Sequence, residues 1–188
     1  MSDSAHKTDE ELACEVQAGD SSAFEGLMKR YEERLLRYGR RYLVRTEDIE
    51  DVVQDVFLKT YENINSYNSS YRFSPWIYRI AHNTFVNVLR KQSRQSFEFF
   101  DFDTIIAPLS GTTVEEKDIE MQSEALEKYL ERIAPKYREV LILYYFEELS
   151  YDEIAEVLHV PIGTVGVRLR RAREALKKVC GKPCNTYE

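Results

Sequence analysis

Apolar side chains recur every three or four residues through most of this chain, and this spacing limits the possible folds more than any other feature. The longest such stripe covers five turns and consists of Phe24, Leu27, Met28, Tyr31, Leu35, Tyr38 and Tyr42. Spacings of three and four place side chains on one face of an α-helix, whereas a half-buried strand alternates at every second residue. Helix breakers are also scarce, with seven Gly and five Pro in 188 residues. We therefore expect an all-α protein rather than a β-sandwich or a Rossmann sheet.

Four helices are expected in the first half of the chain, and together they would form one small domain over residues 1–95. A short helix at about 9–18 precedes the striped one, which begins near Asp20 because this side chain can accept hydrogen bonds from free backbone amides. The third helix is expected to begin at Thr46, and the fourth at Ser74 as its N-cap. The buried sides of these last two helices are expected to comprise Ile49, Val52, Val53, Val56, Phe57 and Tyr61, and Trp76, Ile77, Ile80, Ala81, Phe85, Val88 and Leu89.

The helical period disappears between residues 96 and 120, where seven acidic side chains and one basic side chain are found. We interpret this segment as an acidic linker between two domains, because its short alternating stretch has no partner strands elsewhere. The period then resumes, and Pro135 is expected to open a further helix. A second small helical domain is therefore expected over residues 121–188.

Residues 150–178 have the pattern of a helix-turn-helix. Ser150 and Glu153 can form a capping box at the start of a short helix, and Pro161 restarts a second helix after a turn at His159. The second helix has an apolar stripe of Ile162, Val165, Leu169, Ala172 and Leu176. Its opposite face carries Thr164, Arg168, Arg170, Arg171 and Arg173. Any helical hairpin would explain the stripe, but the cap, the restart and four Arg within six residues together indicate a helix that enters the major groove of DNA.

The net charge of −7 is distributed unevenly along the chain. Residues 72–95 hold five cations and no acid, and residues 168–178 hold six cations and one acid, whereas residues 46–66 have a net charge of −5. A solvated helix face would explain any one of these runs, since most charged side chains are exposed. Two basic runs that coincide with expected helices and are separated by an acidic segment indicate two contacts with a polyanion.

Neither catalysis nor a bound cofactor is expected from this sequence. His6, His82 and His159 are scattered, and no Gly-rich loop accompanies the acidic pairs, so a small-molecule substrate is not expected either. Cys180 and Cys184 are separated by three residues with no His nearby, so two reduced thiols explain them better than a metal site. The longest apolar run has seven residues, against about 18 for a membrane span, and no secretory signal follows the polar start, so we expect a cytoplasmic protein.

Four sequence motifs occur along the chain in the same order as in a known protein family. They are Gly19-Asp20-x3-Phe24, Asp51-Val-Val-Gln-Asp-Val-Phe57, Phe73-Ser-Pro-Trp-Ile-Tyr-Arg-Ile-Ala-His-Asn83, and the helix-turn-helix from Phe146 to Val165 followed by Arg168-Leu-Arg-Arg-Ala-Arg. Together they resemble the two domains of the bacterial extracytoplasmic-function (ECF) sigma factors of RNA polymerase. The resemblance covers about residues 8–95 and 120–178.

This resemblance implies that the chain binds core RNA polymerase, directs it to promoter DNA and helps to open the duplex. The residues expected at the upstream, −35, promoter element are Thr164, Arg168, Arg170, Arg171 and Arg173. Those expected at the downstream, −10, element are Tyr67, Asn68, Tyr71, Arg72, Arg79, Asn83, Arg90 and Lys91. Those expected to dock on core polymerase are Asp51, Gln54 and Asp55.

The residue types expected at the −10 element suit single-stranded DNA. Extruded bases need stacking partners and polar edges, and Tyr67, Tyr71, Asn68 and Asn83 offer both. Arg72, Arg90 and Lys91 can hold phosphates. On the acidic helix, the spacing of four residues places Asp51 and Asp55 on one face, where they would complement a basic protein partner and disfavour DNA.

The resemblance also implies an anti-sigma factor as a further protein partner. The sequence departs from the pattern of the family at two places. Gly166 and Val167 stand where the family usually has a basic or polar pair, which predicts an altered −35 sequence or weaker recognition of it. His159 stands where Gly is usual, but His tolerates a positive φ better than most residues. The alternative is an autonomous helix-turn-helix regulator, although such an output domain normally follows a receiver or ligand domain, and neither is visible before residue 120.

Overall fold

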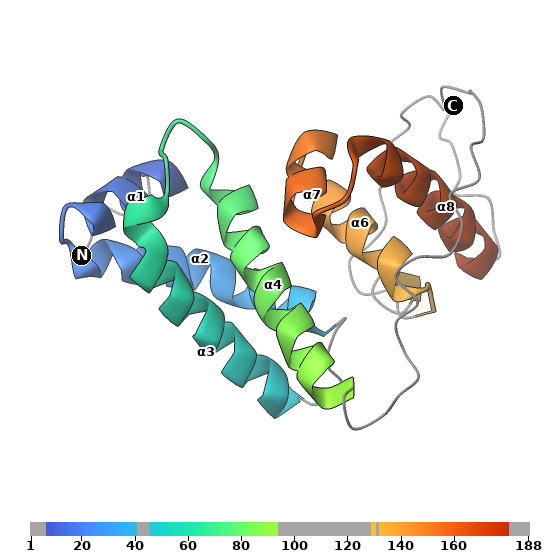
Figure 1. Cartoon of the computed structure of the whole chain (residues 1–188), viewed down its shortest axis with the longest axis horizontal. Helices are drawn as coiled ribbons and strands as arrows, with labels where there is room; N and C mark the ends of the chain where they lie inside the picture. The colour runs from blue at the N-terminus through green and yellow to red at the C-terminus, as the bar shows by residue number, and fades with distance from the viewer. Residues whose placement is uncertain (1–6, 41–45, 94–128, 131, 181–188) are drawn as a thin grey trace.

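The structure is a computed structural model that describes residues 7–40, 46–93, 129–130 and 132–180. Within these ranges every regular element is a helix, so the all-α prediction is confirmed (Figure 1). The acidic linker predicted at residues 96–120 lies outside the described residues, as do Tyr42 and Cys184. None of the described helices is both long enough and apolar enough to cross a membrane.

The first half of the chain forms one group of packed helices. They are α1 (Asp9–Gln17), α2 (Ser21–Gly39), α3 (Thr46–Asn63) and α4 (Phe73–Ser93), with a short 3-10 helix η2 (Ile64–Ser66) after α3. Helix α2 packs against α1 and α3, and α3 packs against α4. Asp20 is the N-cap of α2, as predicted, because its carboxylate accepts a hydrogen bond from the Ser22 amide at 2.9 Å.

The apolar stripe of α2 forms the centre of this group. Five of the predicted members are buried: Phe24, Leu27, Tyr31, Leu35 and Tyr38. The ring of Tyr38 lies edge-on against Tyr78 of α4, with their centroids 5.3 Å apart. Two predicted core positions are wrong, since Met28 is 37% exposed and Tyr61 of α3 is 45% exposed.

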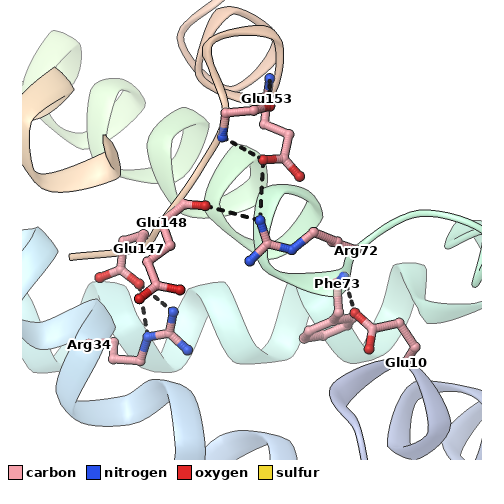
Figure 2. A network of polar contacts seen from close by, with 8 residues as sticks. Glu10, Arg34, Arg72, Phe73, Glu147, Glu148 and Glu153 are labelled. Atoms are coloured by element: carbon pink, nitrogen blue, oxygen red, sulfur yellow. Dashed lines mark hydrogen bonds and ion pairs between the residues drawn. The ribbon is translucent and has the colours of Figure 1, made fainter. Parts of the chain in front are cut away.

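Helix α4 begins at Phe73 rather than after Ser74, so the predicted N-cap is wrong. The backbone amide of Phe73 donates a hydrogen bond to a carboxylate oxygen of Glu10 at 2.9 Å (Figure 2). Helix α1 therefore supplies the cap of α4 from a position 63 residues earlier in the chain. A cap that comes from another helix leaves no local signal in the sequence.

The second half of the chain forms another group of helices, α6 (Pro135–Tyr145), α7 (Tyr151–Leu158) and α8 (Ile162–Cys180). The predicted capping box of α7 is present, since the Glu153 amide donates to Ser150 Oγ at 3.2 Å and the Ser150 amide donates to Glu153 Oε2 at 2.7 Å. Of the predicted stripe of α8, four residues are buried: Val165, Leu169, Ala172 and Leu176. Ile162 is 48% exposed, so its predicted burial is wrong.

Two residues other than Gly end helices in the left-handed region. His159 follows α7 with a φ of 53°, as the sequence predicts, and Glu148 follows α6 with a φ of 50°. The turn at Glu148 is closed by a hydrogen bond from the Leu149 amide to the Leu143 carbonyl at 3.0 Å. Glu147 and Glu148 in this turn contact the first group of helices through Arg34 and Arg72. The following helix, α7, packs against α4 of the first group (Figure 1).

We predict that His159→Gly raises the stability of the protein by up to about 1 kcal/mol, because Gly adopts a positive φ without the steric cost of a Cβ atom. His159→Val is expected to lower it by about as much, because a β-branched side chain is poorly accommodated there. Thermal unfolding followed by circular dichroism measures both changes. Equal melting temperatures for the Gly and Val variants would contradict the assigned turn.

Candidate nucleic-acid and protein-binding surfaces

The polar side chains of helix α8 lie on two flanks of the helix rather than in one strip. Successive residues are rotated by about 100°, so Thr164, Arg168 and Arg171 share one flank. Arg170 and Arg173 fall on the other flank, across the buried stripe. The helix therefore presents one run of three DNA-binding candidates with spacings of four and three residues.

Arg173 is held by the protein itself. Its Nε atom donates a hydrogen bond to the hydroxyl of Tyr145 at 2.9 Å, and its guanidinium lies 5.7 Å from the ring centroids of both Tyr144 and Tyr145. The ring of Tyr144 also lies edge-on against Tyr151, with centroids 5.5 Å apart. Arg173 thus joins α8 to α6, a role that its sequence position did not indicate.

The outward face of α8 between its two polar flanks carries an exposed Glu174 as well as an apolar side chain. Val167 lies there and is 40% exposed. A Cβ atom built on Gly166 would come no closer than 3.8 Å to the ring of Tyr151, so the fold leaves room for a side chain at this position. Packing therefore does not require Gly166, which lies on the same flank as Arg170 and Arg173.

The loop before α4 presents one aromatic ring outward and buries another. Tyr67 is 5% exposed, and its hydroxyl donates a hydrogen bond to the Tyr71 carbonyl. Its ring lies 5.3 Å from those of Phe73 and Trp76, and burial raises the pKa of Tyr67 above its ordinary value. Tyr67 therefore supports the loop from below, whereas Tyr71 is 72% exposed.

The other polar residues expected at the −10 element lie in the same loop as Tyr71 or along helix α4. Asn68 is exposed and closes a turn, since its side chain accepts from the Ser70 amide at 3.0 Å and its carbonyl accepts from the Tyr71 amide at 3.1 Å. Arg79 and Asn83 are both exposed on one face of α4, four residues apart. Lys91 is exposed near the end of the same helix, and Arg90 belongs to that helix too.

Helix α3 exposes the three residues expected to dock on polymerase. Asp51, Gln54 and Asp55 are all exposed, at spacings that place them on one face. Leu58 continues this face one turn later and is 57% exposed, in agreement with its absence from the predicted buried side of this helix. The surface therefore combines carboxylates with an apolar side chain.

A network of polar contacts joins the two groups of helices (Figure 2). Arg34 of α2 donates from Nε to Glu147 Oε2 at 2.8 Å. Arg72 donates from Nη1 to the Glu148 carbonyl at 3.1 Å and to Glu153 Oε2 at 3.3 Å. These pairs are 76 to 113 residues apart in the sequence, so reasoning from local patterns did not find them.

A second part of the same contact is buried. The hydroxyl of Tyr38 donates to Glu139 Oε1 at 2.9 Å, and His82 Nδ1 lies 2.9 Å from the same oxygen. Tyr78 lies nearby, and burial, together with the Glu147 carboxylate, raises its pKa well above the ordinary value. The contact between the two groups thus combines buried hydrogen bonds around Glu139 and Glu147 with an exposed ion pair between Arg72 and Glu153.

We predict that Arg173→Ala lowers the free energy of unfolding by about 1–2 kcal/mol, because it removes a hydrogen bond and two ring contacts. Arg171→Ala is the matched control and is expected to change it by less than about 0.5 kcal/mol, as for a surface substitution. Urea unfolding of both variants measures the difference. A loss for Arg171→Ala as large as that for Arg173→Ala would contradict the structural role of Arg173.

Both groups of helices match known families. Sigma-70 region 2 matches residues 27–95, and sigma-70, region 4 matches residues 123–176. The ECF RNA polymerase sigma factor SigW of Bacillus subtilis is 32% identical over 176 residues, which cover 87% of this chain and 92% of that protein. The ECF RNA polymerase sigma-E factor of Escherichia coli is 36% identical over 178 residues, which cover 90% of this chain and 92% of that protein.

A solved structure agrees in fold. The sigma factor RpoE in complex with the anti-sigma factor NepR from Bartonella quintana has a TM-score of 0.62 at 24% identity, covering 84% of this chain and 96% of that chain. The two sigma-70 regions occur in order, and ECF relatives extend along most of the sequence. The chain therefore belongs to the ECF sigma factors, the promoter-recognition subunits of RNA polymerase.

Proposed function

We propose that this sigma factor recognises its promoter with two separate surfaces and holds core RNA polymerase with a third. Residues 1–95 would form the domain for the −10 element and for polymerase, residues 96–120 the acidic linker, and residues 121–188 the domain for the −35 element. The observation that carries the proposal is that exposed candidate DNA-binding residues lie on both groups of helices. Tyr71 and Arg79 are exposed on the first group, and the flank of α8 that carries Thr164, Arg168 and Arg171 belongs to the second. This activity is recognition without catalysis, and its place is the bacterial cytoplasm, where polymerase meets DNA.

The −10 surface can hold an unstacked base. The ring of Tyr71 offers a stacking face, which is worth about 1–3 kcal/mol per base, while Asn68 and Asn83 offer donors and acceptors for base edges. Arg79 lies on the same face of α4 and can bind the neighbouring phosphate. Tyr67 contributes by fixing the backbone of the loop through its bond to the Tyr71 carbonyl.

The −35 surface is the polar flank of α8, which is the second helix of the helix-turn-helix and the one that enters the groove. Arg168 and Arg171 can each bind a guanine edge or a phosphate in bidentate fashion, and Thr164 stands one turn earlier. Arg170 lies on the other flank and would reach the opposite phosphate backbone. Arg173 would act by keeping α8 in place against α6.

The protein partners follow from the same family membership. The exposed carboxylates of Asp51 and Asp55 would meet a basic surface of core polymerase, beside the apolar side chain of Leu58. An anti-sigma factor is the other partner that we propose, in keeping with the solved complex of the sigma factor RpoE with the anti-sigma factor NepR. An autonomous regulator is not favoured, because sigma-70 matches cover both halves of the chain.

Transcription reconstituted with core polymerase tests the assignment of the −35 surface. We expect the protein to direct initiation at a promoter that it recognises, and Arg171→Ala to reduce that initiation at least tenfold, which corresponds to about 1.4 kcal/mol. Lys177→Ala, near the end of the same helix, serves as the control for a lost positive charge. Unchanged output from Arg171→Ala would count against the assigned flank, and failure of the wild-type protein to stimulate core polymerase would overturn the proposed function.

Charge reversal on α3 tests the polymerase surface. Asp51→Arg combined with Asp55→Arg is expected to weaken binding to core polymerase at least tenfold, because cations would then face a basic partner. Glu25→Arg combined with Glu32→Arg makes the same change of charge on an exposed part of α2 and should leave binding within about twofold. A pull-down titration against core polymerase measures both. Similar losses for both pairs would indicate a general charge effect instead of a docking site.

A further inference from the structure

The loop between α3 and α4 has few apolar contacts of its own. Within residues 64–72, which the structure describes completely, only Ile64 and Tyr67 are buried, and the others are exposed. A segment with so little buried surface opens easily unless hydrogen bonds from other elements hold it. The same loop carries Asn68 and Tyr71, two of the residues that we assign to an unpaired base. The contacts that fix the shape of the loop therefore matter for recognition of the −10 element.

Helix α1 holds the beginning of this loop through one side chain. Gln17 is the last residue of α1, and its Nε2 atom donates hydrogen bonds to the Ile64 carbonyl at 2.7 Å and to the Tyr67 carbonyl at 2.8 Å. A carboxamide nitrogen carries two hydrogens, and both are used here. The two carbonyls lie 47 and 50 residues further along the chain. Gln17 therefore fixes both the short helix η2 and the residue that follows it.

Helix α1 also holds the end of the loop. The Glu10 carboxylate accepts a hydrogen bond from the amide of Phe73, the first residue of α4, at 2.9 Å (Figure 2). Two turns of an α-helix take 7.2 residues, so Glu10 and Gln17 lie on the same face of α1, about 10 Å apart along its axis. Helix α1 is thus a rigid spacer that sets the distance between the two ends of the loop.

The start of α1 is itself fixed to α2. The Asp9 carboxylate accepts from Arg30 Nη1 at 2.6 Å and from the hydroxyl of Tyr31 at 2.6 Å. Thr8 and Glu11 form a capping box that closes the first turn of α1. Because Tyr31 is fully buried, the spacer is anchored in the centre of the first group of helices.

Tyr67 connects the bond from α1 to the exposed ring of Tyr71. The carbonyl of Tyr67 accepts from Gln17, and the hydroxyl of Tyr67 donates to the Tyr71 carbonyl. The ring of Tyr67 is packed against Phe73 and Trp76, with centroids 5.3 Å apart in both pairs. A single buried side chain therefore links Gln17 to the backbone of the residue that would stack on a base.

We propose that Gln17 and Glu10 are positioning residues for the −10 element, which hold the loop in the shape that receives an unpaired base. This inference rests on the proposed function, since it concerns the surface assigned there to the −10 element. A loop that is already ordered loses little further conformational entropy when the base binds. When the loop is released, only a fraction of molecules has the receptive shape, and the apparent dissociation constant is the intrinsic value divided by that fraction.

Two substitutions at Gln17 remove its donors and keep the length of its side chain. Gln17→Met cannot donate, and Gln17→Glu places acceptor oxygens opposite the two carbonyl oxygens. Each is expected to weaken binding of the −10 strand at least about fivefold, because two hydrogen bonds are lost. Ala18→Glu adds the same negative charge at the next position, which is exposed, and should change the affinity by less than about twofold.

The measurement uses the full-length chain assembled with core polymerase. The probe is a labelled single-stranded DNA with the −10 sequence of a promoter at which the wild-type protein directs initiation. Fluorescence anisotropy at fixed salt gives the dissociation constant, because affinities for DNA depend on salt. Circular dichroism confirms that each variant is folded before it is compared with the wild type.

Substitutions at Glu10 test the other end of the loop. Glu10→Ala removes the acceptor for the Phe73 amide and should weaken binding of the same DNA about fivefold. Glu10→Gln keeps an acceptor oxygen on a side chain of equal length and should stay within about twofold of the wild type. Equal losses for Glu10→Ala and Glu10→Gln would contradict the role of this hydrogen bond in positioning the loop.

A double-variant cycle with Tyr71→Ala separates positioning from a general loss of stability. When the ring of Tyr71 is absent, the further loss caused by Gln17→Met should shrink to less than about twofold, because residues that act through one another are not additive. Fully additive losses would overturn the proposal, and so would wild-type affinity in both Gln17 variants. Both results leave initiation by the wild-type protein intact, whereas failure of the wild type to stimulate core polymerase would remove the proposed function itself.

Discussion

The arrangement of this protein depends on the requirement that a buried carboxylate has a partner. Glu139 and Glu147 come from the second group of helices and are almost fully buried, and they bind Arg34, Tyr38 and His82 on α2 and α4 of the first group. Desolvated charges of this kind are tolerated only when they are paired and hydrogen-bonded. The relative placement of the two groups therefore rests on a few specific pairs as well as on apolar packing.

Helix α4 connects the functional surfaces to one another. Its start is capped by Glu10 of α1, its buried face packs with α3 inside the first group, and another face contacts α7. The exposed Arg79 and Asn83 lie on the same helix, next to the loop that carries Tyr71. Arg72 lies directly beside the surface assigned to the −10 element and is bound to Glu153 of α7. A change in the contact with α7 would therefore change the position of Arg72.

Helix α8 shows how a basic run in a sequence separates into different roles. Four Arg residues fall within six positions, but they lie on different sides of the helix because an α-helix has 3.6 residues per turn. Arg168 and Arg171 share a flank with Thr164, whereas Arg173 is held by Tyr145 and supports the packing of α8 on α6. Val167 occupies the outward face between the flanks. The surface offered to DNA is therefore narrower and less charged than a count of Arg residues indicates.

The sequence by itself determined the helices, because their signals are local: apolar side chains every three or four residues, Asp20 and the pair of Ser150 and Glu153 as caps, and His159 in a left-handed turn. It also indicated the exposed faces of α3, α4 and α8, since a helix places residues four apart on one side. Only the tertiary structure decided that Glu10 caps α4, that Tyr67 is buried beneath Tyr71, and that Arg34, Tyr38, Arg72 and His82 bind carboxylates of the other group. Each of these interactions except the Tyr67 bond joins residues more than 50 positions apart, and no local period or motif encodes which distant partners meet in space.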